Sequence, residues 1–242
     1  MTRPLRVLVA TAVPVERDAV AVAFRTEQRA VPVPGAPLRR LTTPGARWDL
    51  LAAGVGPAAA ASGTASALTA AALDGAPYDL VVSTGIGGGF APDAPVGSLV
   101  VADAITAADL GAEAGDGAGF LPVTELGFGT VTHTPPAPLV RAVAGALDCP
   151  TGGVLTVSTV TGTAARAADL RARHPGALAE AMEGFGVAEA AAAHGRPVLE
   201  IRAVSNPVGP RDRSAWRIAD ALDALTDAFA TCAPVLESGE PS

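Results

Sequence analysis

The chain has 242 residues, of which 49% are hydrophobic and 17% are charged, and its formal net charge is −7. This composition excludes a disordered chain, and the length predicts a single domain with a sizeable core. The negative charge and the lack of any run of Lys and Arg argue against nucleic acid as a partner, and no unbroken apolar stretch has the length of a membrane span.

Apolar, β-branched runs alternate with Ala-rich stretches along the chain. The runs predict strands at residues 7–13, 50–55, 80–84, 98–105, 154–160 and 198–204. The Ala-rich stretches predict helices at residues 57–73, 139–147, 184–194 and 214–229. Strands that alternate with helices indicate an α/β fold with a largely parallel or mixed sheet.

The Gly- and Pro-rich segments at residues 31–37, 112–122 and 133–138 are predicted to be loops inside one domain. None has the length or composition of a linker between domains. We therefore predict one domain over residues 1–236 and a frayed tail at 237–242. Cys149 and Cys232 lie far apart and form no disulfide framework, which favours the reducing cytoplasm.

Four glycines occur within residues 85–89, directly after the strand predicted at 80–84. Glycine costs chain entropy, so such a cluster predicts a tight turn or a close approach of the backbone to a bound group. A second glycine motif, GVGPAA at residues 54–59, matches a dinucleotide-binding fingerprint, with Asp74 about twenty residues further on. Asp74 ends a predicted helix rather than a strand, so a simple strand-to-helix turn with Pro57 at the first helical position is favoured.

Other familiar sites are absent from the sequence. Neither the phosphate-binding loop that ends in Gly-Lys-Ser/Thr nor the G-x-S-x-G nucleophile motif occurs. The three histidines, His133, His174 and His194, are dispersed without ligand spacing, so no metal site is predicted.

Candidate site residues stand at the ends of two predicted strands and at the start of a predicted helix. Glu16 comes shortly after the first strand, Met182 and Glu183 precede an Ala-rich helix, and Ser205 and Asn206 end another strand. Singly, these acids and this amide are typical of helix starts and turns. Because α/β sheets build their sites at the carboxyl ends of strands, these residues together predict one pocket.

The chain resembles the nucleoside phosphorylase superfamily, and within it most closely the methylthioadenosine/adenosylhomocysteine nucleosidase branch. The matching segments are VLVATAVPVE, STGIGGGFAPDAPVGSLVVAD, AMEGFGVA and IRAVSNPVG, in the order found in the superfamily. The resemblance implies a three-layer fold, with a central mixed β-sheet flanked by helices, and a homo-oligomer. It also implies a small-molecule nucleoside substrate and no cofactor.

The resemblance assigns the sugar site. Ile86, Gly87 and Gly88 would line the space for the ribose and the attacking water, although the nucleosidases carry a serine at the position of Ile86. Glu16 would be the general base that activates water. Glu183 would accept hydrogen bonds from the ribose diol, and its charge would complement the cationic sugar of the transition state.

The remaining assignments concern the sugar face, the base and the nucleophile. Met182 would pack on the sugar, while Gly162 and Thr163 fall where the base-binding segment of the superfamily lies. Phosphorylases bring in phosphate with an arginine shortly before the glycine cluster. Here that stretch reads YDLVV, which favours water as the nucleophile.

Position 206 departs from the adenine-specific nucleosidases, which have aspartate there. The amide of Asn206 can donate hydrogen bonds to O6 and N7 of a 6-oxopurine, whereas a carboxylate would mostly accept. A mispaired group in a buried site costs about 1–3 kcal/mol. The leaving base is therefore predicted to be hypoxanthine rather than adenine.

A hydrolase of this kind resembles the futalosine hydrolase family, to which TVTG, MEGFGVA and SNPVGPRDR are also similar. That resemblance implies a substrate with an aromatic carboxylate. Arg211 and Arg213 are candidates to bind the carboxylate or to pair with Asp212 at the surface, and Asp109 and Glu113 either approach the site or are solvated. An adenine-releasing nucleosidase, a purine nucleoside phosphorylase and a non-catalytic nucleoside-binding protein remain alternatives.

Overall fold

The computed structural model describes residues 3–35, 37–115 and 119–238. Within this part of the chain, ten strands form one mixed sheet and two form a separate hairpin. In spatial order the sheet comprises β11 (Ala177–Ala181), β10 (Thr151–Thr156), β6 (Leu99–Ala107), β12 (Val198–Pro207), β5 (Leu80–Gly89), β1 (Leu5–Thr11), β4 (Ala46–Ala52), β3 (Leu38–Thr42) and β2 (Arg29–Val31), with β9 (Thr132–His133) beside β6. Because β11 also pairs with β5, the strands from β5 to β11 close into a ring.

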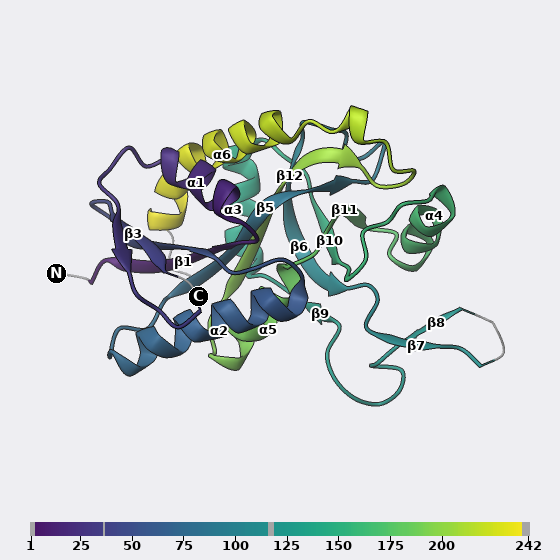
Figure 1. The fold of residues 1–242 in the computed structure, drawn as a ribbon, viewed down its shortest axis with the longest axis horizontal. Coiled ribbons are helices and arrows are strands. Elements are labelled where there is room, and N and C mark those ends of the chain that lie inside the picture. The colour runs from purple at the N-terminus through teal and green to yellow at the C-terminus, as the bar shows by residue number, and fades with distance from the viewer. Residues whose placement is uncertain (1–2, 36, 116–118, 239–242) are drawn as a thin grey trace.

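Helices cover both faces of the sheet (Figure 1). One face carries α1 (Pro14–Val22), α3 (Ala137–Leu147) and α6 (Ile218–Ser238), and the other carries α2 (Pro57–Leu73) and α5 (Gly184–Ala193). At one end of the molecule lie α4 (Ala164–Arg173) and the hairpin of β7 (Gly111–Glu113) and β8 (Phe120–Pro122). This arrangement confirms the predicted three-layer fold with a central mixed sheet.

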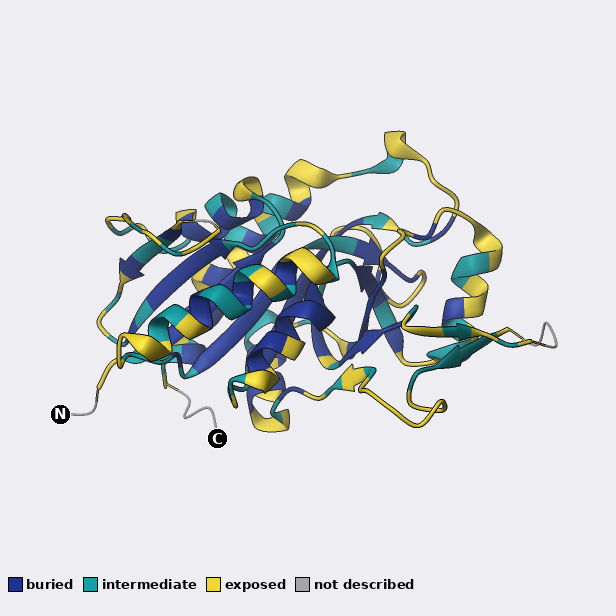
Figure 2. Cartoon of the chain, turned by 60° about the horizontal axis from the view of Figure 1, so that its bottom comes forward, coloured by how far each residue is buried: buried dark blue, intermediate teal, exposed yellow. Residues whose placement is uncertain are grey.

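The central strands are buried on both faces, as the continuous apolar runs indicate. In β1, Val7 and Val9 pack in the core beneath α1, α3 and α6, whereas Leu8 and Ala10 pack in the core beneath α2 and α5. Figure 2 shows the same pattern, with a buried sheet between partly exposed helices. Burying a Val or Leu side chain contributes about 1.5–3 kcal/mol to folding, so these strands hold the layers together.

Most elements predicted from local pattern are present. The six predicted strands correspond to β1, β4, β5, β6, β10 and β12, and the helix predicted at 57–73 is α2. The short helix α4 and strand β11 were not predicted, because neither has a long apolar run. The loop predicted at residues 112–122 is wrong, since residues 111–113 and 120–122 pair as β7 and β8.

Of the two alternatives given for the glycines at residues 85–89, the tight turn is wrong, because β5 continues to Gly89. Its glycines allow a close approach of neighbours rather than a reversal of the chain. A Cβ at Gly87 would lie 2.8 Å from the backbone oxygen of Glu180, and a Cβ at Gly85 would lie 2.6 Å from Oε1 of Glu16.

The C-terminal helix differs from its prediction at both ends. Residues 213–215 form a separate 3₁₀ turn, and α6 extends from Ile218 to Ser238. Glu237 accepts hydrogen bonds from Thr43 (2.6 Å) and from the indole N–H of Trp48 (3.1 Å). The predicted frayed tail therefore begins too early, and its residues 239–242 lie outside the described residues. In the part of the chain that the structure describes, no helix is long and apolar enough to cross a membrane.

Candidate active site

A cavity of about 210 Å³ lies at the carboxyl ends of the parallel strands β1, β5 and β12. Ligand sites of α/β sheets commonly form at such ends. Seven of the nine residues that the sequence analysis selected line this cavity: Glu16, Ile86, Gly87, Gly88, Met182, Glu183 and Asn206. The fold therefore brings widely separated segments to one place.

Glu16 is buried in the first turn of α1. Its Oε2 atom accepts hydrogen bonds from the N–H groups of Ala12 (3.0 Å) and Val13 (3.3 Å), which caps the helix. Its Oε1 atom accepts a hydrogen bond from the N–H of Ile86 (2.9 Å). Burial raises the pKa of Glu16, while the hydrogen bonds and the charge of Arg202 oppose this rise. A carboxylate with a raised pKa suits a general base.

The contact from position 86 to Glu16 is made by the main chain. The isoleucine provides this N–H as well as a serine would, so the departure from the nucleosidase pattern leaves the hydrogen bond to Glu16 intact.

Glu183 lies at the start of α5 and is only 7% exposed. Its Oε1 atom accepts a hydrogen bond from the N–H of Gly56 (3.2 Å), and its Oε2 atom accepts one from the N–H of Met182 (3.3 Å). The same Oε2 atom lies 3.5 Å from Nη1 of Arg202. The glycine turn at residues 54–56, which the sequence indicated as a strand-to-helix turn, thus also positions this carboxylate.

Sequence reasoning missed the buried pair of Glu200 and Arg202 on β12. Arg202 donates a hydrogen bond from Nε to Glu200 (2.8 Å) and one from Nη2 to Ser83 (3.1 Å), and both charged side chains are fully buried. Burial raises the pKa of Glu200, whereas the charge of Arg202 lowers it. The sequence indicated this pair, because Glu200 and Arg202 are charged residues inside the apolar run at 198–204, and charged residues are almost never fully buried unless they are paired.

The guanidinium group of Arg202 lies among the carboxyl groups beside the cavity. Nη1 of Arg202 has no hydrogen-bond partner among the described residues, and it faces Glu183. Three carboxyl groups (Glu16, Glu183 and Glu200) therefore surround one guanidinium group. An excess of carboxylates favours a ligand that gains positive charge.

Asn206 lies near the end of β12. Its Oδ1 atom accepts a hydrogen bond from the hydroxyl of Ser205 (2.8 Å), which also lies 3.2 Å from the backbone oxygen of Gly87. Its Nδ2 atom donates to the backbone oxygen of Pro207 (3.1 Å). The amide oxygen is thus occupied, and one hydrogen of the NH₂ group remains for a ligand.

Two predicted residues do not line the cavity. Thr163 caps α4, where its hydroxyl accepts a hydrogen bond from the N–H of Arg166 (3.2 Å), and Gly162 precedes it. The preceding residues Val160 and Thr161 line the cavity instead, as does Glu180 of β11. The cavity therefore takes its lining from two residues before the predicted pair, because Thr163 begins α4.

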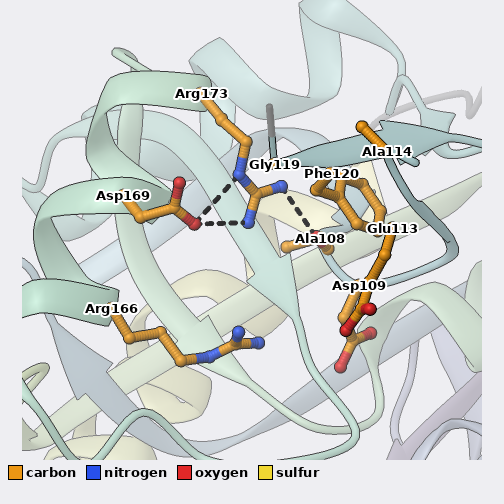
Figure 3. A pocket seen from close by; sticks show the side chains of 9 residues that line it. All are labelled: Ala108, Asp109, Glu113, Ala114, Gly119, Phe120, Arg166, Asp169 and Arg173. Atoms are coloured by element: carbon orange, nitrogen blue, oxygen red, sulfur yellow. Dashed lines mark hydrogen bonds and ion pairs between the residues drawn. The ribbon is translucent and has the colours of Figure 1, made fainter. Parts of the chain in front are cut away.

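Asp109 and Glu113 line a second cavity of about 410 Å³, between α4 and the β7–β8 hairpin (Figure 3). Arg173, which lines this cavity, donates hydrogen bonds to the carboxylate of Asp169 (3.0 Å) and to the backbone oxygen of Ala108 (3.0 Å). Asp109 accepts a hydrogen bond from the N–H of Ser158 (2.7 Å). These acids thus lie in a different cavity from Glu16 and Asn206.

The candidate arginines for a substrate carboxylate lie after β12. The guanidinium carbon of Arg211 lies over the ring of Trp216, 5.6 Å from the ring centroid, and Trp216 itself lines the first cavity. Arg213 begins the 3₁₀ turn, and the carboxylate of Asp212 accepts from Ser214 (2.9 Å from the backbone N–H). Of the two arginines, Arg211 therefore has the closer connection to the cavity.

In the described ranges, no group of three or more His, Cys, Asp or Glu side chains could hold a metal ion. His194 follows α5 as its C-cap, and its Nε2 atom lies 3.1 Å from the hydroxyl of Thr69.

The phosphorylase superfamily matches residues 7–238 of the chain. A futalosine hydrolase of Streptomyces coelicolor is 76% identical over 98% of this chain and 99% of its own length, and one of Acidothermus cellulolyticus is 49% identical over 92% and 88%. The chain belongs to this superfamily, in its futalosine hydrolase family. It is accordingly an enzyme that hydrolyses N-glycosidic bonds.

Solved structures agree with the fold. The structure of a futalosine hydrolase from Helicobacter pylori superimposes with a TM-score of 0.82, at 15% identity, over 96% of this chain and 98% of that one. At this identity the likeness concerns the fold alone.

Proposed function

We propose that this enzyme hydrolyses the N-glycosidic bond of futalosine, releasing hypoxanthine and dehypoxanthine futalosine, as a step of menaquinone biosynthesis. The observation that carries the proposal is that Glu16, Glu183 and Asn206, from three distant parts of the chain, line one cavity. The substrate is suggested by the two relatives named futalosine hydrolase.

Glu16 would take a proton from the attacking water. Its Oε1 atom lies against Gly85 of β5, where an added Cβ would come within 2.6 Å of it, and Gly87 and Gly88 of the same strand line the cavity in which the water and the sugar would bind. Its raised pKa makes the carboxylate a stronger base than an exposed glutamate. Proton transfer of this kind typically contributes about 10²–10⁴-fold to the rate.

Glu183 would bind the ribose diol, with Met182 packed on the sugar. The N–H groups of Gly56 and Met182 and the side chain of Arg202 fix the carboxylate before the substrate arrives. As the glycosidic bond breaks, the sugar gains positive charge, and the surrounding carboxylates stabilise it.

Asn206 would bind the leaving base. With Oδ1 held by Ser205 and one amide hydrogen on the backbone oxygen of Pro207, the remaining N–H would be shared between the acceptors O6 and N7 of a 6-oxopurine. The aromatic carboxylate of futalosine would extend toward Trp216 and Arg211.

The test is an assay for free base. The protein is mixed with futalosine, inosine or methylthioadenosine, each with and without inorganic phosphate, and the released base is separated and quantified. We expect hypoxanthine from futalosine without any requirement for phosphate. Phosphate-dependent release would identify a phosphorylase, preferential release of adenine would identify a methylthioadenosine-type nucleosidase, and no release would indicate a binding protein.

A further inference from the structure

Two polar side chains flank the bare backbone of Gly88 at one end of the cavity. Glu180 of β11 and Asn206 of β12 both pair with Gly88 of β5, one on each side. Because neighbouring strands lie about 4.8 Å apart, the two side chains start about 10 Å from each other on one face of the sheet. A Cβ at position 88 would lie 3.2 Å from Nδ2 of Asn206, so glycine keeps the space between them open.

Glu180 is a buried carboxylate for which the proposed mechanism has no use. It is 4% exposed and lines the same cavity as Asn206. Its Oε1 atom accepts a hydrogen bond from the N–H of Thr161 (2.8 Å), and its Oε2 atom accepts one from the Thr161 hydroxyl. A carboxylate has about four acceptor positions, so both oxygens can accept a further donor.

The position of Glu180 separates it from the sugar-binding acids. Glu16 accepts a hydrogen bond from Ile86 and Glu183 accepts one from Gly56. Glu180 is instead held by Thr161, and β11 lies on the other side of Gly88 from Asn206. A purine bound by Asn206 through N7 and O6 would direct its six-membered ring toward Glu180. The next atom after C6 on that ring is N1.

The two purine classes differ at N1. A 6-oxopurine carries a hydrogen on N1 and donates there, whereas N1 of a 6-aminopurine is an acceptor. We propose that Glu180 is a base-binding residue that accepts the N1–H hydrogen bond of the 6-oxopurine and so selects it together with Asn206. This inference rests on the proposed function, because it names the contact that the released base makes.

The contact between Glu180 and N1 would weaken the binding of adenine as well as strengthen the binding of hypoxanthine. A carboxylate opposite N1 of a 6-aminopurine places two acceptors against each other, and a buried acceptor pair is unfavourable. The two hydrogen bonds from Thr161 hold the carboxylate in place, so it cannot easily turn away.

The experiment compares Glu180→Gln with the wild type on futalosine and on its 6-amino counterpart. In the variant, the amide oxygen can keep the bond to the Thr161 N–H while the NH₂ group contacts the hydroxyl and the base. That NH₂ group would oppose N1–H and suit the acceptor N1 of the 6-aminopurine. We expect kcat/KM for futalosine to fall by about ten- to a hundredfold and the ratio of the two substrates to shift toward the 6-amino compound. Glu189→Gln, an exposed acid of α5 that contacts His133 (2.8 Å) outside the cavity, is the matched control and should leave the ratio unchanged.

A second measurement needs no variant. Hypoxanthine and 1-methylhypoxanthine are titrated into the wild-type enzyme, and the methyl group, which removes the N1 donor, should weaken binding at least about tenfold. If wild type releases no base from futalosine, the proposed function fails. If it does release hypoxanthine, an unchanged substrate ratio in Glu180→Gln overturns the role of Glu180 and leaves the proposed function standing. Should that variant not fold, equal affinities of the wild type for hypoxanthine and 1-methylhypoxanthine overturn that role.

Discussion

Glu16 performs two tasks with its two oxygen atoms. Oε2 caps α1 through the N–H groups of Ala12 and Val13, and Oε1 reaches the N–H of Ile86 on β5. The cap fixes the carboxylate relative to its own helix, and the second contact fixes it relative to the glycine-rich strand. A general base needs such a fixed position, because proton transfer depends on distance and alignment.

The first prediction at this scale is that Glu16→Gln lowers kcat by about 10²–10⁴-fold with little change in KM. The amide keeps the shape and an acceptor oxygen but cannot take a proton from water at neutral pH. Steady-state kinetics with futalosine provide the measurement, and equal unfolding temperatures of both proteins provide the control. An unimpaired variant would place the base elsewhere.

The pH profile gives a second prediction. Burial raises the pKa of Glu16 above its ordinary value of 4.5. The base works only when deprotonated, so activity should fall as the pH drops through this raised pKa. We expect the acid limb of log kcat/KM against pH to lie above pH 4.5 and to disappear in Glu16→Gln. A limb at or below the ordinary value would contradict Glu16 as the group whose deprotonation limits the rate.

Asn206→Asp tests the recognition of the base. A carboxylate at this position accepts where the amide donates, so kcat/KM for futalosine should fall by about ten- to a hundredfold. Activity on the 6-amino counterpart should fall less or rise. The ratio of kcat/KM for the two substrates is the measured quantity. A wild type that already prefers the 6-amino substrate would contradict the assignment of position 206.

At the scale of elements, the packing of α2 against α5 positions Glu183, the residue proposed to bind the sugar. Gly56 precedes α2 and donates to Glu183, which precedes α5. The helices approach closely at Gly186, where an added Cβ would collide with the backbone oxygen of Pro57. The separation of these two helices therefore determines whether Glu183 keeps its hydrogen bond.

We predict that Gly186→Ala lowers the free energy of unfolding by about 1–3 kcal/mol, because a methyl group has no room at this crossing. It should also lower activity, since the start of α2 would move away from Glu183. Gly145→Ala in α3 is the matched control: outside its own helix, no atom of the described residues lies within 4 Å of its added Cβ, and the change should stabilise by about 0.5–1 kcal/mol. Chemical denaturation of wild type and the two variants measures both changes in the free energy of unfolding, and steady-state kinetics measure the activity of Gly186→Ala. Equal stability of Gly186→Ala and wild type would refute the close crossing.

Element-scale prediction from the sequence succeeded where the pattern was local. The helix α2 follows from an uninterrupted Ala-rich stretch that begins at Pro57, and β1, β5 and β12 follow from their apolar runs. Strand β11 and helix α4 are short, and neither has a long apolar run. Their place is set by pairing with β5 and β10 and by the cap at Thr163, which local pattern does not report.

At the scale of the whole molecule, several large apolar side chains are left exposed. The segment around the β7–β8 hairpin projects from the body, and Leu110, Leu126 and Phe128 on it are 41%, 40% and 65% exposed. We propose that this segment packs against a second copy, in the homo-oligomer that the family resemblance implies. Sedimentation equilibrium should give a multiple of the 23.9 kDa chain mass, and Phe128→Ser should shift the equilibrium toward the monomer. A wild type that is monomeric at micromolar concentration would contradict this proposal.

The sequence by itself determined the layered α/β fold and the residue types of the site. Glu16, Glu183 and Asn206 stand in recognisable motifs, and the apolar runs identify the central strands because burial on both faces leaves a local record. Only the tertiary structure decided which groups meet. The hydrogen bond from Gly56 to Glu183 spans 127 residues, and the pairing of Glu180 and Asn206 on either side of Gly88 depends on strand register. The physical reason is that register and helix separation arise from contacts between distant segments, which no local periodicity of the chain encodes.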